Sequence, residues 1–136
     1  MKKYLLDTSL VAGYLLNREK AIALVSPLIE RAEAATSMLV YGEVIEYLKG
    51  LPHYQEKYAA LHTILNEIPP YPLTYAILER YAEIRRTLRP LHQEIGDIDT
   101  LIAATALEER VTLVTIDRDF ERVPHLKVKL IDLKVA

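Results

Sequence analysis

The 136-residue chain is 51% hydrophobic and 26% charged, which is typical of a folded globular protein and excludes an intrinsically disordered chain. It contains no cysteine, so disulfides, zinc–thiolate clusters and cysteine nucleophiles are excluded. The formal charge of −2 gives no general attraction for nucleic acid, so any phosphate-binding surface must be local. A nucleic-acid substrate is not excluded either, because neutralising four carboxylates would raise the charge to +2.

The N-terminal part of the chain begins with a short apolar run followed by two helical segments. Residues 3–6 are predicted to form a buried strand. A helix is predicted over residues 9–16, and either Thr8 or Ser9 fits its N-cap position. Apolar residues at helical spacing predict a second helix over residues 18–34.

The middle of the chain is predicted to be mainly helical. Residues 35–38 form a short predicted strand, and a helix over residues 40–49 follows it until Gly50. A further helix over residues 53–67 is stopped by two consecutive prolines. The next helix, over residues 74–88, has its apolar residues on one face and ends before Pro90.

The C-terminal part returns to short strands. Gly96 interrupts the chain, and Asp97 fits the N-cap of a helix that runs through residue 109. Residues 111–116 and 127–133 are the last two predicted strands.

Short apolar strands separated by helices predict an α/β fold with helices on both faces of a parallel sheet of four or five strands. The absence of repeats, low-complexity tracts and long linkers predicts a single domain over residues 1–136. No apolar run approaches the ~20 residues that span a bilayer, and the N-terminus is too short for a signal peptide. We therefore expect a cytoplasmic protein without a membrane segment.

Four acidic residues lie where such a fold would form an active site: Asp7, Glu43, Asp99 and Asp117. Asp7 and Asp117 each follow an apolar strand, and the carboxyl ends of parallel strands border the ligand crevice. Carboxylates crowded together repel one another unless a cation neutralises them. Converging carboxylates without cysteine suit Mg²⁺ or Mn²⁺, which prefer oxygen ligands, and suit zinc poorly.

Two of these assignments require a choice between acids two residues apart. We assign helix capping to Asp97 and metal binding to Asp99. We favour Asp117 over Asp119 because it directly follows the strand, and we keep Asp119 in a supporting role. The hydroxyls of Thr8 and Ser9 can point towards a metal-associated water or cap the helix instead.

Four blocks of the sequence occur in a recognisable order: LLDTS at 5–9, YGEV at 41–44, IGDIDTLIAATA at 95–106 and LVTIDRDF at 113–120. Together they resemble PIN-domain nucleases, and most of all the VapC-type toxins of type II toxin–antitoxin pairs. Related toxins often carry Asn after the Thr of the last block, whereas this chain has Ile116 and Asp117 there. Thr115 matches the Thr of that block and is expected to orient a carboxylate or a water.

The resemblance implies a three-layer α/β/α PIN fold with a Mg²⁺- or Mn²⁺-dependent endoribonuclease site. The family's four acidic positions fall on Asp7, Glu43, Asp99 and Asp117, of which Asp7, Asp99 and Asp117 are the expected metal ligands. The family also implies an RNA substrate, a homodimer and a cognate antitoxin protein.

Basic side chains are candidates for RNA contacts: Arg85, Arg86, Arg89 and Arg118. The first three lie late in one predicted helix, where a favourable interaction with the helix dipole and a solvated face explain them equally well. The four histidines have no metal-ligand spacing and are interpreted as surface or packing residues.

Two other functions remain open at the level of sequence. A phosphatase would use Asp7 as a covalent nucleophile. Haloacid dehalogenase-like phosphatases carry a second Asp two residues further on, however, and this chain has Ser9 there. The other alternative is a catalytically silent PIN fold that binds RNA or protein, although all four acidic positions are filled.

Overall fold

A five-stranded sheet lies at the centre of the computed structural model, which describes residues 2–133. Every pair of neighbouring strands is parallel, and the strand order is β3-β2-β1-β4-β5. The strands are β1 (Tyr4–Leu6), β2 (Ala34–Ser37), β3 (Pro70–Tyr71), β4 (Thr112–Thr115) and β5 (Val128–Leu130). The α-helices are α1 (Thr8–Leu15), α2 (Glu19–Glu30), α3 (Met38–Lys49), α4 (Tyr54–Ile64), α5 (Tyr75–Leu88) and α6 (Asp97–Glu109). Two short 3-10 helices complete the order: η1 (Arg89–Leu91) and η2 (Arg118–Arg122).

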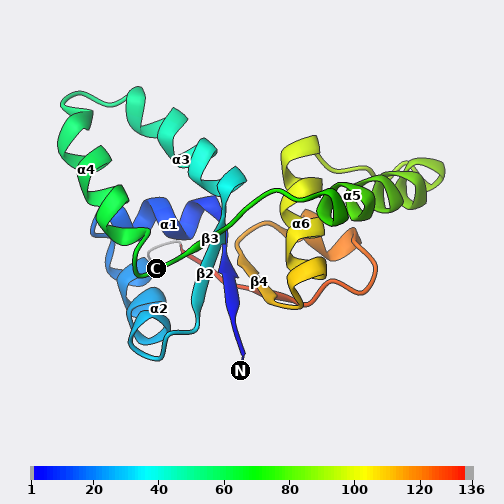
Figure 1. The fold of residues 1–136 in the computed structure, drawn as a ribbon, viewed down its shortest axis with the longest axis horizontal. Helices are drawn as coiled ribbons and strands as arrows, with labels where there is room; N and C mark the ends of the chain where they lie inside the picture. The colour runs from blue at the N-terminus through cyan, green and yellow to red at the C-terminus, as the bar shows by residue number, and fades with distance from the viewer. Residues whose placement is uncertain (1, 134–136) are drawn as a thin grey trace.

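The helices cover the sheet from both sides, as Figure 1 shows. Helices α1 to α4 lie on one side and α5 with α6 on the other, which gives three layers. This division follows from the strand order, because the chain runs outward from β1 to β3 and then returns past β1 to β4. The expected three-layer α/β/α fold is therefore confirmed.

The core lies between these layers and includes strands β1 and β4. Leu5 and Leu6 of β1 are fully buried, as is Leu113 of β4. Strands β1, β2 and β4 are covered on both faces, so a continuous buried run replaces the alternating pattern of a half-exposed sheet. Helix α6 contributes a run of small buried residues from Ile102 to Ala106, which allows it to pack closely on the sheet.

The sequence did not predict strand β3. Pro70 lies within it, and proline normally ends a strand or a helix because it has no N–H to donate. Here β3 is the edge of the sheet, and the carbonyl of Pro69 accepts a hydrogen bond from the amide of Thr36 at 3.1 Å. Prolines are tolerated at such an edge, so the segment that stops α4 also extends the sheet.

Two predicted helix caps were wrong. The N-cap of α1 is Asp7, whose carboxylate accepts a hydrogen bond from the amide of Thr8, so neither Thr8 nor Ser9 caps that helix. The N-cap of α6 is Gly96, and Asp97 is the first helical residue. The predicted helix over residues 18–34 was also too long, because α2 ends at Glu30 before a left-handed Ala32 turns the chain into β2.

Across residues 2–133, no helix is long and apolar enough to cross a membrane.

Candidate active site

The four predicted acids meet in one pocket at the carboxyl edge of the sheet. Its volume is about 440 Å³, and its lining residues are Asp7, Thr8, Ser9, Glu43, Asp99, Ile116 and Asp117. Four different elements supply the acids: the end of β1, helix α3, the first turn of α6 and the segment after β4. Residues 110 positions apart in the sequence are thus brought together, as the parallel-sheet argument predicted.

Asp7 is the most constrained of the four. Only 8% of its surface is exposed. Its Oδ1 accepts a hydrogen bond from the amide of Thr8 at 2.8 Å, and its Oδ2 accepts one from the hydroxyl of Thr115 at 2.7 Å. Burial raises the pKa of Asp7 above its ordinary value, and the two hydrogen bonds oppose that rise because they stabilise the charged form. Asp7 is therefore held in one orientation at a cost that its hydrogen bonds partly offset.

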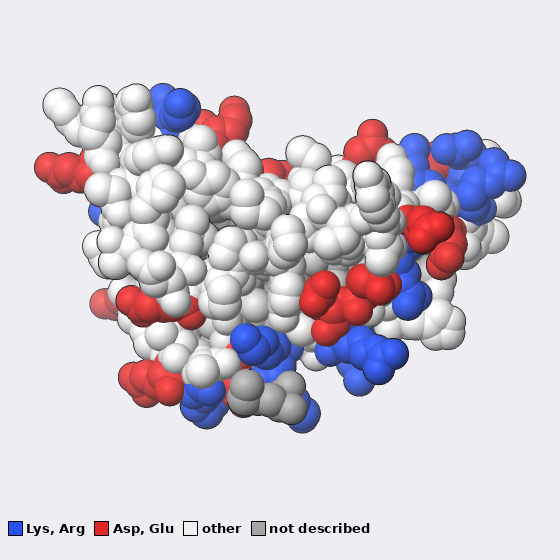
Figure 2. Space-filling model, in the orientation of Figure 1, with Lys and Arg blue, Asp and Glu red and all other residues white. Residues whose placement is uncertain are grey.

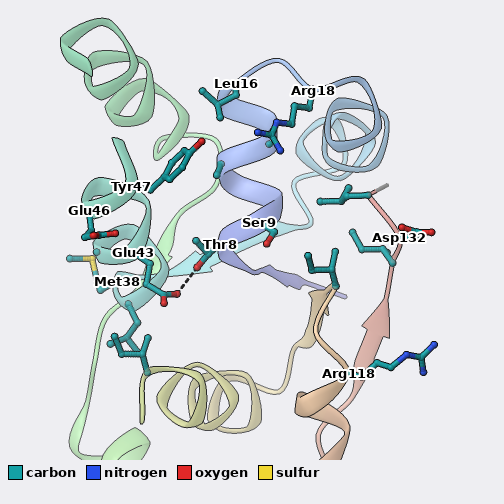
Figure 3. A pocket seen from close by; sticks show the side chains of 18 residues that line it. Thr8, Ser9, Leu16, Arg18, Met38, Glu43, Glu46, Tyr47, Arg118 and Asp132 are labelled. Atoms are coloured by element: carbon teal, nitrogen blue, oxygen red, sulfur yellow. Dashed lines mark hydrogen bonds between the residues drawn. The ribbon is translucent and has the colours of Figure 1, made fainter. Parts of the chain in front are cut away.

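Glu43 enters the pocket from α3, whose N-terminus is fixed by Ser37. The Ser37 hydroxyl caps the helix by accepting a hydrogen bond from the amide of Val40 at 3.1 Å. The hydroxyl of Thr8 donates to Glu43 Oε1 at 2.6 Å, and Figure 3 draws this bond across the pocket. From the sequence, the Thr8 hydroxyl was expected to face a metal-associated water or to cap the helix, whereas in the structure it donates to Glu43.

Asp99 is half-buried in the first turn of α6. The pKa of Asp99 is raised to about 6 in total, and burial of the carboxylate is the largest cause. Nearby negative charges add to this rise: Asp7, Glu43, Asp117 and Asp119. Such mutual repulsion is the electrostatic signature of a site that a cation would stabilise.

Asp117 and Asp119 lie differently relative to the pocket. Asp117 lines the pocket, and its amide donates to the Thr115 hydroxyl at 3.1 Å. Asp119 does not line the pocket. Its amide donates to Asp117 Oδ1 at 2.9 Å, and its carboxylate lies 3.3 Å from Arg122. Asp119 is thus placed to orient Asp117 from outside.

The donor set of the pocket fits a hard divalent cation. The polar side-chain groups that line it are carboxylates and hydroxyls, and the carboxylates destabilise one another. Within residues 2–133, no three acidic or histidine side chains form a ready-made cage for an ion. Mg²⁺ suits this arrangement, because it keeps several waters and usually takes only one or two carboxylates directly.

A second, larger groove of about 1410 Å³ continues from the acidic pocket. The two share Thr8, Ser9, Glu43 and Ile116. Figure 3 shows Met38, Glu43, Glu46 and Tyr47 along α3 on one side, with Leu16 and Arg18 at the end of α1 opposite. No pattern in the sequence predicted this groove, because its apolar lining comes from separate helices and from residues 131–133.

The predicted RNA-binding arginines lie in two places. Arg118 lines the large groove, together with Arg18, which the sequence did not single out. Arg86 and Arg89 are exposed near the end of α5, and in Figure 2 basic side chains gather over that end of the molecule. Arg85 is largely covered and lies 3.2 Å from Asp97.

The packing interpretation of the histidines agrees with the surroundings of His62. Its ring lies edge-on against Tyr58 and Tyr41, with centroid distances of 4.7 Å and 6.1 Å. This aromatic contact joins α3 to α4 outside the acidic pocket.

Comparison with known proteins agrees with this fold. A family model described as PIN domain matches residues 4–126. The chain therefore belongs to the PIN-domain family.

Two curated relatives narrow the assignment. The chain is 28% identical over 126 residues to Ribonuclease VapC1 of Haemophilus influenzae (strain R2866), covering 91% of this chain and 94% of that protein. It is 30% identical over 125 residues to Ribonuclease VapC19 of Mycobacterium tuberculosis (strain CDC 1551 / Oshkosh), covering 90% and 96%. Within the PIN-domain family the chain is thus of the VapC type, as its motifs predicted.

The fold is also similar to that in a solved structure of VapBC2 from Rickettsia felis bound to a DNA fragment from their promoter. The TM-score is 0.84 at 23% sequence identity, and the match covers 95% of this chain and 98% of that chain. At this identity the likeness supports the fold.

Proposed function

We propose that the protein is a divalent-metal-dependent endoribonuclease that acts as the toxin of a toxin–antitoxin pair. The observation that carries the proposal is the convergence of Asp7, Glu43, Asp99 and Asp117 on one pocket. The curated relatives named above are ribonucleases of the VapC type, which supports RNA as the substrate.

In the proposed mechanism Asp7, Asp99 and Asp117 hold Mg²⁺ or Mn²⁺. When bound, the cation neutralises the carboxylates and offsets negative charge on the scissile phosphate. A water attacks the phosphorus in line and the P–O3′ bond breaks, which leaves a 5′-phosphate on one product. Glu43, held by the Thr8 hydroxyl, accepts the proton of that water, and the 3′-oxygen takes a proton from solvent.

The surrounding residues position the acids. Thr115 orients Asp7, and Asp119 orients Asp117 through its backbone amide. Ser9 lines both the acidic pocket and the larger groove, so its hydroxyl is available to an ordered water or to the RNA backbone.

The RNA path is proposed to follow exposed arginines. Arg118 lies in the groove beside the acids, and Arg86 and Arg89 are solvent-exposed at the end of α5. Arginine binds phosphate through parallel hydrogen bonds, so these residues would fix the register of the RNA without reading its sequence. The ion pair between Arg85 and Asp97 makes Arg85 a weaker candidate for a direct phosphate contact.

The large groove is proposed to receive the cognate antitoxin. Its lining combines apolar side chains such as Met38 and Ile98 with the acidic Glu43 and Glu46. A partner helix with an apolar face would fill the groove, and a basic residue of the partner would pair with the acids. Such a residue would occupy the place of the metal.

A homodimer in the cytoplasm completes the proposal. The tyrosine-rich helices α3 and α4 give candidate interface surfaces, since interfaces favour tyrosine. Sedimentation at high micromolar concentration tests this point, and a monomer throughout would contradict it.

The experiment for the proposed function is a cleavage assay on single-stranded RNA with Mg²⁺ and with EDTA. Internal cleavage that depends on Mg²⁺ and yields 5′-phosphate ends is the expected result. Trapping of a phosphorylated Asp7 would favour the phosphatase instead. RNA binding without any cleavage would favour the silent module.

A further inference from the structure

The N-terminus of α6 is held by the neighbouring helix α5. Its cap residue is Gly96, which has no side chain to satisfy the first amides of the helix. Asp97 does not turn back to cap the helix. Its carboxylate accepts a hydrogen bond from the phenol of Tyr81 at 3.0 Å, and the same oxygen lies 3.2 Å from Arg85 Nη1.

Arg85 makes a second contact with the same segment. Its guanidinium donates to the carbonyl of Ile95 at 3.3 Å. Tyr81, Arg85 and Asp97, with the carbonyl of Ile95, therefore form a connection that we call the α5–α6 clamp. It holds the chain on both sides of Gly96, immediately before the turn that carries Asp99.

We propose that the α5–α6 clamp positions Asp99 for cation binding. Asp97 and Asp99 lie two apart in one helical turn, so their side chains leave the helix in different directions. Asp97 points to α5, while Asp99 points into the acidic pocket. Fixing Asp97 against α5 therefore fixes the rotation of the helical turn and its position along the helix axis. That same turn carries Asp99.

Electrostatic repulsion in the acidic pocket explains why the first turn of α6 needs to be held in place. Asp99 is repelled by Asp7, Glu43 and Asp117, so an unrestrained first turn of α6 would move away from them. A metal site requires its ligands to be held to within about half an ångström. The clamp fixes the position of the turn from the side that faces away from the pocket, so the turn cannot shift under this repulsion. Tyr81, Arg85 and Asp97 are positioning residues in this sense.

The contribution of the clamp to global stability is small by comparison. The side chain of Asp97 is 68% exposed and that of Arg85 is 24% exposed, and ion pairs with an exposed partner stabilise a fold only weakly. Loss of the clamp should therefore change cation binding far more than it changes the unfolding temperature.

Arg85→Gln separates positioning from simple electrostatics. Removing a positive charge near an acidic pocket would, by Coulomb attraction alone, tighten the binding of a cation. Loss of positioning has the opposite sign and weakens binding. Arg80→Gln is the matched control, because it removes the same charge and an ion pair between the same two helices, with Glu108 at the other end of α6.

The test is titration of the full chain with Mn²⁺ by calorimetry, without RNA. We expect Arg85→Gln to weaken Mn²⁺ binding by about tenfold, the range seen when a residue that orients a ligand is removed. Tyr81→Phe, which loses only the phenol, should give a smaller loss. Arg80→Gln, and Tyr75→Phe at a residue of the same helix that is 89% exposed, should bind Mn²⁺ no more weakly than the wild type. Binding by Arg85→Gln that equals or exceeds that of the wild type would overturn the clamp.

The proposed role of the clamp rests on the proposed metal site. A measurement without metal therefore distinguishes a failure of the clamp from a failure of the metal site. The amide of Thr100 donates to the Gly96 carbonyl at 2.8 Å in the first turn of α6. Hydrogen exchange of this amide in EDTA should be faster in Arg85→Gln than in the wild type. Failure of the wild type to bind Mn²⁺ would reject the metal site, while faster exchange would still support the clamp. Unchanged exchange in both clamp variants would reject the clamp itself.

Discussion

The hydroxyl of Thr115 donates a hydrogen bond to Oδ2 of Asp7 at 2.7 Å, across 108 positions of sequence. The same hydroxyl accepts the amide of Asp117 at 3.1 Å. One fully buried side chain at the end of β4 thus fixes an acid that follows β1 and an acid that follows β4. The relative placement of two proposed metal ligands depends on this contact.

Thr115→Val should impair the site while keeping its shape. Valine fills the same volume but leaves Asp7 without one partner, which raises the pKa of that carboxyl further. We expect RNA cleavage to fall by about 10- to 100-fold. Thr115→Ser keeps the hydroxyl and should retain most of the activity. Equal activity of the valine and wild-type proteins would show that this contact has no part in the reaction.

The stability of the metal-free protein should fall as the pH rises from about 4 to about 6. The pKa of Asp99 is about 6 in the folded protein and ordinarily 3.8, so the folded state holds the proton more tightly. Deprotonation through this window therefore favours unfolding, and the loss persists at higher pH. Thermal unfolding in EDTA across this range measures it.

The matched variant for this pH effect is Asp99→Asn, which cannot titrate at that position. Its unfolding temperature should change less between pH 4 and pH 6 than that of the wild type. Saturating Mg²⁺ should also reduce the loss in the wild type, because the cation offsets the repulsion among the acids. Identical pH profiles for both proteins would show that the pH dependence of stability does not come from Asp99.

The close packing of α1 on α2 depends on Gly13. A Cβ added at Gly13 would lie 2.9 Å from Cβ of Ala21, which cannot rotate away. Overpacking typically costs about 1–3 kcal/mol, and the gain in helix propensity offsets about 1 kcal/mol. Gly13→Ala should therefore destabilise the fold in urea denaturation. Gly42→Ala is the control, because a Cβ there meets no described atom within 4 Å, and it should stabilise the protein by about 0.5–1 kcal/mol.

Inhibition by the antitoxin should depend on a basic residue of the partner that reaches the acids. Replacing that residue by alanine should restore cleavage while the apolar contacts in the groove keep much of the affinity. Measuring binding and cleavage with the same variant separates the two effects. Full inhibition by the alanine variant at saturating concentration would indicate that the antitoxin blocks the path of the RNA instead.

The sequence predicted the positions of the acidic residues better than it predicted the contacts that hold them. The sequence predicted correctly that Asp7 and Asp117 lie at the same edge of the sheet, because the carboxyl ends of parallel strands share one edge whatever the strand order. The predicted role of Asp97 as the N-cap of α6 was wrong. A capping preference depends on the local sequence, whereas the observed partners of Asp97, Tyr81 and Arg85, lie on another helix. Strand β3 was missed since Pro70 contradicts strand propensity, and the strand is revealed by its pairing with β2, Thr36 with Pro70 and Ser37 with Tyr71.

The most direct test of the account is RNA cleavage by Asp7→Asn at saturating Mg²⁺. The change removes a proposed ligand and a charge with little change in volume, so the fold should remain. Glu83→Gln on α5 is the control for loss of one exposed carboxylate. We predict that Asp7→Asn cleaves no faster than the RNA degrades without protein, while its unfolding temperature in EDTA equals or exceeds that of the wild type, because like-charge repulsion is relieved. Cleavage by Asp7→Asn at the wild-type rate would contradict the proposed site.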